Sequence, residues 1–133
     1  MRVEPLITAG LTALALQLAG CGEPTVSFSK DVKPILEERC VECHGGAGEG
    51  VAASGFSVRD YDSVMKGTSL GAVVVAGSSL SSSLYLVVAQ KTAPEIHMPP
   101  QHPEAWAEGR GTPLTDEQIE IFRAWIDQGD RNN

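Results

Sequence analysis

The stretch Cys40-Val41-Glu42-Cys43-His44 decides how the rest of this chain is interpreted. It spells Cys-x-x-Cys-His, a pattern typical of c-type haem attachment. At this spacing, near the end of a helix, each of the two thiols can add to one vinyl group of a single porphyrin. The histidine that follows lies under the iron and can donate a ring nitrogen as the proximal ligand. The motif therefore predicts thioether bonds at Cys40 and Cys43 and an iron ligand at His44.

The same three side chains have other uses, which the surrounding sequence disfavours. A structural zinc site needs four ligands, and only Cys40, Cys43 and His44 cluster here. A thioredoxin-like redox pair follows a strand in a βαβ unit, whereas a helical pattern precedes this motif. A plain disulfide leaves His44 without a role. Covalent haem attachment is the interpretation that uses all three side chains.

A second iron ligand is expected from the segment His97-Met98-Pro99-Pro100. A thioether must reach the iron from the face opposite His44, on a segment that keeps its shape without secondary structure. Prolines supply that stiffness, because they fix φ and reduce the entropy of the unfolded chain. We therefore expect Met98 to be the distal ligand, although a methionine can also simply fill the core. His97 is the rival ligand, and His102 is a further alternative.

The N-terminal residues 1–20 have the features of a signal peptide. The apolar stretch from Leu6 to Ala19 has 14 residues, and a helix of that length spans about 21 Å, too short for a hydrocarbon core of about 30 Å. It ends in Leu18-Ala19-Gly20-Cys21, which resembles a bacterial lipobox, so we expect cleavage before Cys21 and lipidation of that cysteine. An uncleaved anchor, or a plain signal peptide with Cys21 as a spare thiol, is the alternative.

Residues 21–27 would then be a lipidated tether, and residues 28–130 the folded domain. Acyl chains on one residue hold a protein to a membrane without a spanning helix, so we expect an exported, lipid-anchored protein at the periplasmic face. Gly22 instead of Asp follows the cysteine, which in Gram-negative lipoproteins favours the outer membrane. Three cysteines in 133 residues exclude a dense disulfide scaffold. A net charge of −7 argues against nucleic acid as a partner.

Apolar spacing in the first half of the mature chain predicts helices separated by loops. A helix is expected over 28–41, with Asp31 as its N-cap and Pro34 in its first turn. The glycine-rich stretch 45–54 is expected to be a loop. A short helix is expected over 61–66.

The second half of the chain continues the same pattern. A helix is expected over 84–91, capped by Ser82 or Ser83, and residues 92–113 hold five prolines and no periodicity. The clearest helix follows Thr115, which forms a capping box with Gln118. The chain is therefore expected to be all-α with long loops.

Taken in order, these segments resemble a class I c-type cytochrome. The similarity is closer still to the cytochrome c-like domains of many planctomycete and related bacterial proteins. The matching segments cover nearly all of residues 28–130, and they are 28–36, 40–45, 71–77 leading into 82–84, 98–100 and 114–129. The resemblance implies an N-terminal and a C-terminal helix that cross over one edge of a covalently bound haem c. It also implies His44 and Met98 as the axial ligands.

The resemblance further implies that Ile35 or Leu36 meets Phe122 or Trp125 where the two helices cross. Two inserts, 45–55 and 101–113, depart from the family pattern. Trp106 and Arg110, in the second insert, either close over the haem edge or a propionate or coat the surface. Arg59 either binds a propionate or is a solvated charge.

These features predict a monohaem electron carrier and not an enzyme. With His44 and Met98 both bound to iron, neither haem face is open to a substrate, and methionine ligation raises the reduction potential relative to two nitrogen ligands. Single electrons would pass between redox partner proteins, whose basic docking surfaces would suit this acidic chain.

Other haem functions are also compatible with parts of the sequence. A haem-based sensor of a gas or small ligand, in which the Met98 bond yields, is the main alternative. A small peroxidase would need a second haem and a distal acid–base group, for which the sequence offers no candidate. A structural module whose haem only fills the core is a further alternative.

Overall fold

The structure, a computed structural model, describes residues 22–133. The expected signal peptide (1–20) and Cys21 lie outside the described residues. Over residues 22–133 the chain forms helices and loops, with one isolated bridge between Thr68 and Gly71 and no strand. The prediction of an all-α fold is confirmed. None of the helices in this part of the chain combines the length and the apolar character needed to cross a bilayer.

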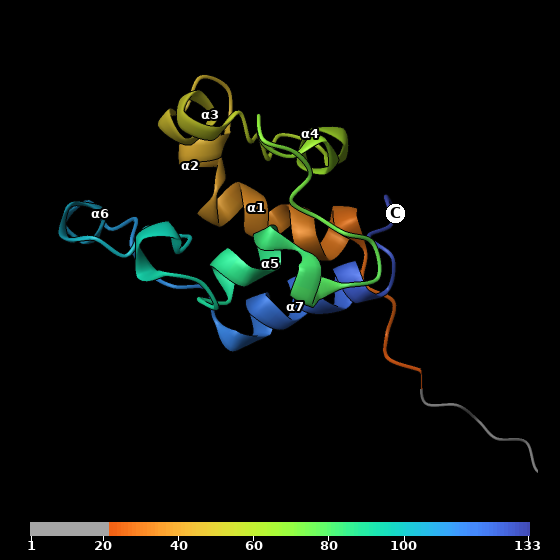
Figure 1. Cartoon of the computed structure of the whole chain (residues 1–133). Coiled ribbons are helices and arrows are strands. Elements are labelled where there is room, and N and C mark those ends of the chain that lie inside the picture. The colour runs from red at the N-terminus through yellow and green to blue at the C-terminus, as the bar shows by residue number, and fades with distance from the viewer. Residues whose placement is uncertain (1–21) are drawn as a thin grey trace, which may run out of the picture.

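The α-helices are short, and the connections before and after the fifth of them are long. They are α1 (Lys33–Arg39), α2 (Val41–His44), α3 (Glu49–Ser54), α4 (Tyr61–Lys66), α5 (Ser83–Val88), α6 (Pro103–Ala107) and α7 (Asp116–Asp127). A π-helical turn, η1 (Phe28–Val32), leads into α1, and the 3-10 turns η2 (Ser79–Ser81) and η3 (Pro94–Ile96) lie before and after α5. In Figure 1, α1, α5 and α7 lie close together, α2, α3 and α4 lie above them, and α6 stands to one side.

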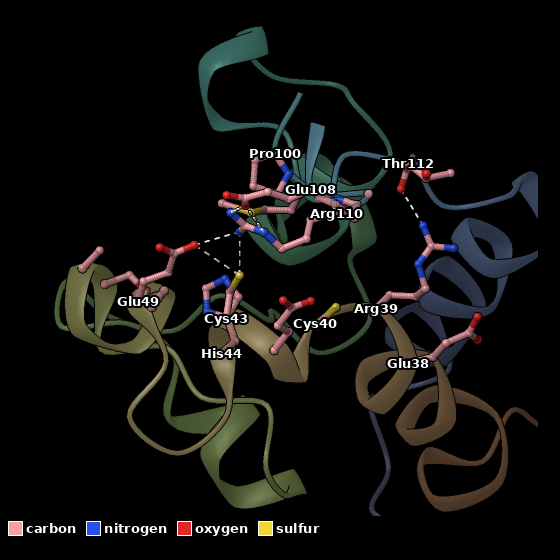
Figure 2. A pocket seen from close by; sticks show the side chains of 17 residues that line it. Glu38, Arg39, Cys40, Cys43, His44, Glu49, Pro100, Glu108, Arg110 and Thr112 are labelled. Carbon is pink, nitrogen blue, oxygen red and sulfur yellow. Dashed lines mark hydrogen bonds and ion pairs between the residues drawn. The ribbon is translucent and has the colours of Figure 1, made fainter. Parts of the chain in front are cut away.

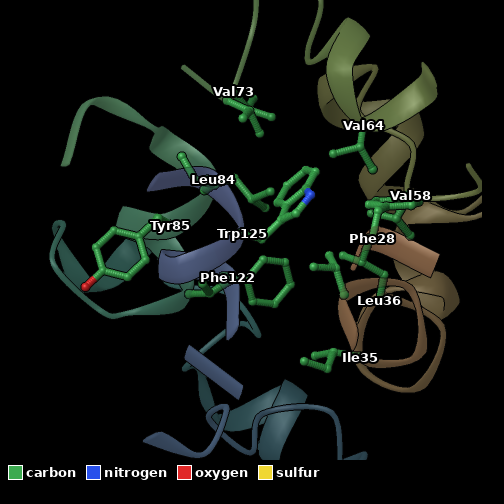
Figure 3. Packing of buried hydrophobic residues seen from close by; sticks show 14 of the residues in the cluster. Phe28, Ile35, Leu36, Val58, Val64, Val73, Leu84, Tyr85, Phe122 and Trp125 are labelled. Carbon is green, nitrogen blue, oxygen red and sulfur yellow. The ribbon is translucent and has the colours of Figure 1, made fainter. Parts of the chain in front are cut away.

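The hydrophobic core joins the two ends of the domain. Phe28 in η1 packs against Trp125 in α7, with ring centroids 5.5 Å apart, and meets Tyr61 at 5.2 Å. Figure 3 shows Phe122 and Trp125 of α7 pointing toward side chains of η1 and α1. Ile35, Leu36, Phe122 and Trp125 belong to one buried cluster, in agreement with the crossing that the resemblance implied. We call η1, α1, α5 and α7 the base of the domain.

The first helical run begins at Phe28, as predicted, but its N-cap and its end differ from the prediction. Asp31 is not the N-cap, because Ser27 holds that position and its Oγ accepts from the Lys30 amide at 3.3 Å. The Asp31 carboxylate instead accepts from the Ser27 amide at 2.7 Å. The side chains of Ser27 and Asp31 thus each accept a hydrogen bond from a backbone amide at the start of the helix. The helix is also broken at Cys40, before α2 begins.

Two stretches expected to be irregular contain helices. α3 lies inside the glycine-rich stretch, where Gly48 is the N-cap and Gly55, at φ 75°, is the C-cap. Glycine is favoured at the ends of helices, so the glycines at these two positions bound α3 and do not prevent it from forming. α6 lies inside the proline-rich stretch 92–113, where Pro103 occupies the first helical position and the His102 side chain caps the helix.

The remaining helices agree with the sequence except at the ends of α5. Its predicted C-terminus at Lys91 is wrong, because the helix stops at Val88. Ser82 is its N-cap by position, but its hydroxyl donates to the Ser78 carbonyl at 2.8 Å and does not cap the helix. At α7 the capping box of Thr115 and Gln118 is present as predicted.

Candidate functional site

The Cys-x-x-Cys-His motif forms a short helical turn that is set off from the helix before it. α1 ends at Arg39, and the backbone of Cys40 (φ −127°, ψ −28°) leaves helical geometry before α2 begins. The His44 amide donates to the Cys40 carbonyl at 2.8 Å, which closes the turn. The two thiols therefore lie three residues apart on one turn. Both thiols and the His44 ring line the same cavity (Figure 2).

The His44 ring is held in a defined orientation. Its Nδ1 lies 3.1 Å from the Phe56 carbonyl oxygen, and the two rings meet edge to face with centroids 5.4 Å apart. As a donor to that carbonyl, Nδ1 carries the proton, and Nε2 keeps its lone pair for a metal. Gly50 packs against the other side of the ring, where a Cβ would stand 2.6 Å from Cε1. The chain thus presents an imidazole that is ready to act as a ligand.

A cavity of about 600 Å³ lies beside this turn, within the range of about 300–1,000 Å³ common for ligand sites. Its lining brings together Met98, Pro99 and Pro100 with the three side chains of the motif. The Met98 amide donates to the Val87 carbonyl at 3.1 Å, which ties this loop to α5. An imidazole, a thioether and two thiols around one cavity are the donor set that a c-type haem requires. The residues present therefore fit that group.

The structure separates the three candidates for the distal ligand. Met98 lines the cavity, whereas His97 and His102 are not among the lining residues. The Nε2 of His97 lies 3.0 Å from the Thr92 carbonyl oxygen. The Nδ1 of His102 accepts from the Ala105 amide at 3.3 Å and caps α6. Both imidazoles thus have local partners.

The two thiols of the motif are free in the structure and not joined to each other. Burial raises the pKa of the Cys40 thiol to about 11. Loss of solvation also raises the pKa of Cys43, although its hydrogen bond from Arg110 opposes that shift. A redox-active thiol needs a lowered pKa, so these environments do not suit thiolate chemistry. Among residues 22–133, no group of three or more His, Cys, Asp or Glu side chains is placed to hold a metal ion.

Residues 101–113, which we call the strap, reach the mouth of the cavity at their C-terminal end, where Glu108, Gly109, Arg110 and Thr112 line it. Arg110 lines the cavity, and its Nη1 lies 2.8 Å from Glu49 Oε1 and 3.3 Å from Cys43 Sγ. Glu108 also pairs with this guanidinium and raises its pKa, with the Cys43 contact as a second cause. Trp106 is 59% exposed and does not line the cavity. Of the two candidates in this insert, only Arg110 is at the site.

Several residues at the site were not expected from the sequence. The Phe56 carbonyl that orients His44 is a backbone group, which no sequence pattern marks. Gly50 and Glu49 lie in the stretch that was expected to be a loop, and no motif marks Glu108. Arg59, which the sequence offered as a propionate ligand, lies outside the cavity in an exposed pair with Asp60.

The comparisons with known proteins agree with this geometry. Residues 40–102, just under half of the chain, match the family model described as planctomycete cytochrome C. No curated protein and no solved structure matches the chain. The matched segment begins at the first cysteine of the motif and includes Met98.

Proposed function

We propose that the chain is a monohaem electron carrier anchored to a membrane, because residues 40–102 match the family model described as planctomycete cytochrome C. Domains of this type carry a covalently bound haem c and take part in electron transfer. The finer proposal is one haem, held by thioether bonds to Cys40 and Cys43. His44 and Met98 would be its axial ligands.

The observation that carries this proposal is the shared cavity. The motif turn and the Met-Pro-Pro loop lie far apart in sequence, yet both line the same space of about 600 Å³. Covalently bound haem supplies an iron that alternates between the ferrous and ferric states. The chain's own part is to hold two ligands in place, His44 through the Phe56 carbonyl and Met98 through the Val87 carbonyl. Fixed ligands keep the geometry alike in both states, which suits electron transfer.

Methionine is favoured over histidine as the distal ligand for a local reason. Met98 lines the cavity, whereas the His97 Nε2 lies within hydrogen-bonding distance of the Thr92 carbonyl. For His97 to bind iron, this side chain would have to leave its partner and turn toward the cavity. A methionine thioether has no such partner to lose.

Anchoring through lipid on Cys21 is part of the same proposal. The tether beyond it packs against the folded domain, because the Val26 amide donates to Gln128 Oε1 at 2.8 Å and the Gln128 side chain donates to the Pro24 carbonyl at 3.1 Å. Lipid on Cys21 would then hold the domain close to the membrane surface, on the periplasmic side of an exported protein. Location, anchor and signal peptide are tested together by labelling with a fatty acid and by the Cys21→Ala variant.

The negative charge around the cavity favours redox partners with basic docking surfaces. Carboxylates of Glu38, Glu42, Glu49 and Glu108 line the cavity, against two guanidiniums. Long-range attraction to a basic partner would speed encounter and weaken as salt rises. The rate of electron exchange with a basic protein should therefore fall with ionic strength.

The decisive experiment is spectroscopy of the purified holoprotein. A pyridine haemochrome spectrum with two thioether bonds is expected. The thioether-to-ferric charge-transfer band should disappear in Met98→Ala and persist in the matched variant His97→Ala. A parent protein without this band, whose spectrum changes in His97→Ala and not in Met98→Ala, would establish His97 as the ligand. Fast, stoichiometric binding of carbon monoxide by the reduced parent protein would instead favour the sensor function.

A further inference from the structure

The strap is fastened on both sides of the Cys-x-x-Cys-His motif. Arg39, which directly precedes Cys40, donates to the Thr112 carbonyl at 2.5 Å and to the Pro113 carbonyl at 3.3 Å. Arg110, from the strap, reaches back to Glu49 of α3 at 2.8 Å. Figure 2 shows both links, one on each side of the thiols. Arg39 thus reaches from the motif to the strap, and Arg110 reaches from the strap to α3. Together the two guanidiniums hold the strap against the edge of the cavity where the thiols lie.

Arg110 differs from the other charges at the mouth of the cavity in its burial. Its side chain is 19% exposed, whereas those of Glu49 and Glu108 are 72% and 57% exposed. Its Nη1 is also 3.3 Å from Cys43 Sγ. A charge with little exposure is screened less by water and salt than its exposed partners are. The nearest well-shielded charge to the Cys43 sulfur is thus positive.

We propose that Arg110 is a positioning and tuning residue, which fastens the strap over the Cys43 edge and raises the reduction potential there. This rests on the proposed haem site. Ferric haem carries one more positive charge than ferrous haem, so a fixed cation beside the thioether edge disfavours the ferric form. Glu49 and Glu108 hold the guanidinium in place and offset part of its effect. The same cation makes the electrostatic potential at the Cys43 edge less negative for any molecule that exchanges electrons at this edge.

The test compares the Arg110→Gln and Arg123→Gln holoproteins. Arg123 is a matched control, because it also pairs with carboxylates, those of Glu23, Glu120 and Asp127, but it lies on α7 and does not line the cavity. Arg110→Gln should disfavour reduction threefold to tenfold, a fall of up to about 59 mV in the midpoint potential of a one-electron couple. Arg110→Lys should retain most of the potential, and Arg123→Gln should leave it unchanged.

A second variant separates charge from loosening of the strap. Glu49→Gln removes the link to α3 but also removes a negative charge, so its potential should rise. A fall in Glu49→Gln would mean that the link matters only as a mechanical tie, and it would overturn the tuning role. Equal potentials in the parent and Arg110→Gln would overturn it as well. If Arg110→Gln is not recovered, Arg110→Lys tests the charge instead, because a fall in its potential as large as the one expected for Arg110→Gln would overturn the tuning role.

Small-molecule oxidants of opposite charge provide an independent readout. Because a lower potential speeds the oxidation of Arg110→Gln by any reagent, the comparison of two oxidants is the readout. Relative to the parent, the rate with the cation tris(phenanthroline)cobalt(III) should rise by a larger factor than the rate with the anion ferricyanide. Equal factors for the two oxidants would indicate no charge effect at this edge and would contradict the proposal. A pyridine haemochrome spectrum of each variant keeps this result separate from the proposed function, because absence of covalent haem would refute the haem site itself.

Discussion

The base and the mouth of the cavity are held together by different forces. In the base, η1, α1, α5 and α7 contribute most of the fully buried side chains, with Leu36, Phe122 and Trp125 at 1% exposure or less. At the mouth, α2 and α3 contain no buried residue and α6 contains only Ala105. There the chain relies on close glycine contacts and on Arg39 and Arg110. The base can thus form a core by itself, whereas the mouth lacks apolar filling from protein alone.

The largest expected effect would come from breaking the base. Phe122→Ala removes a ring that is 0% exposed, and such a deletion costs about 3–5 kcal/mol of unfolding free energy. Denaturant unfolding of the holoprotein measures it. The control Leu70→Ala, at a side chain 98% exposed, should change the free energy by less than about 0.5 kcal/mol. A small loss in Phe122→Ala would mean that the base does not carry the stability.

A substitution at the mouth should change the position of His44, the proposed iron ligand, without unfolding the base. In Gly50→Ala the new Cβ would stand 2.6 Å from His44 Cε1, and the ring cannot retreat freely because Phe56 packs on it. Overpacking of this kind costs about 1–3 kcal/mol. We expect a shifted haem spectrum with unchanged hydrogen exchange in α7. Ala52→Gly, at an exposed site on the same helix, should leave the spectrum as it is, and a spectrum unchanged by Gly50→Ala would contradict the close contact.

The smallest expected effect concerns a buried carboxyl at the end of the base. Burial raises the pKa of Asp130, which is 7% exposed and follows α7. Since the raised pKa belongs to the folded state, the domain loses stability as pH rises through it. Asp130→Asn should be more stable than the parent by up to about 0.5 kcal/mol near pH 7. This gain should shrink as pH falls through the raised pKa of the folded state and be lost below about 3.9, the ordinary pKa of an aspartate.

Unfolding free energies measured from pH 3 to pH 7 test this dependence. Asn also tolerates the positive φ of 47° at this position, but that contribution does not vary with pH. The exposed control Asp62→Asn should show no comparable trend. A gain for Asp130→Asn that is constant with pH would rule out burial as its cause.

The same contrast explains how far the sequence could predict the fold and the site. The base follows from patterns within single segments, such as the Thr115–Gln118 capping box and the apolar spacing of α7. The motif also identified Cys40, Cys43 and His44 as candidates without any structure. α3 and α6 were missed because glycines and prolines at helix ends look the same as those of a loop. The Phe56 carbonyl and the Arg110–Glu49 link join distant segments, so nothing local in the sequence marks them.

The break at Cys40 has a consequence for how this chain can vary. Its amide donates to the Leu36 carbonyl at 3.0 Å, so the last turn of α1 passes directly from a core residue to the first thiol. A helix turns about 100° per residue. One residue inserted between Leu36 and Cys40 would therefore rotate both sulfurs away from the cavity while leaving the motif intact. The spacing between core and motif is thus part of the proposed haem-binding signature, as much as the spacing between the two cysteines.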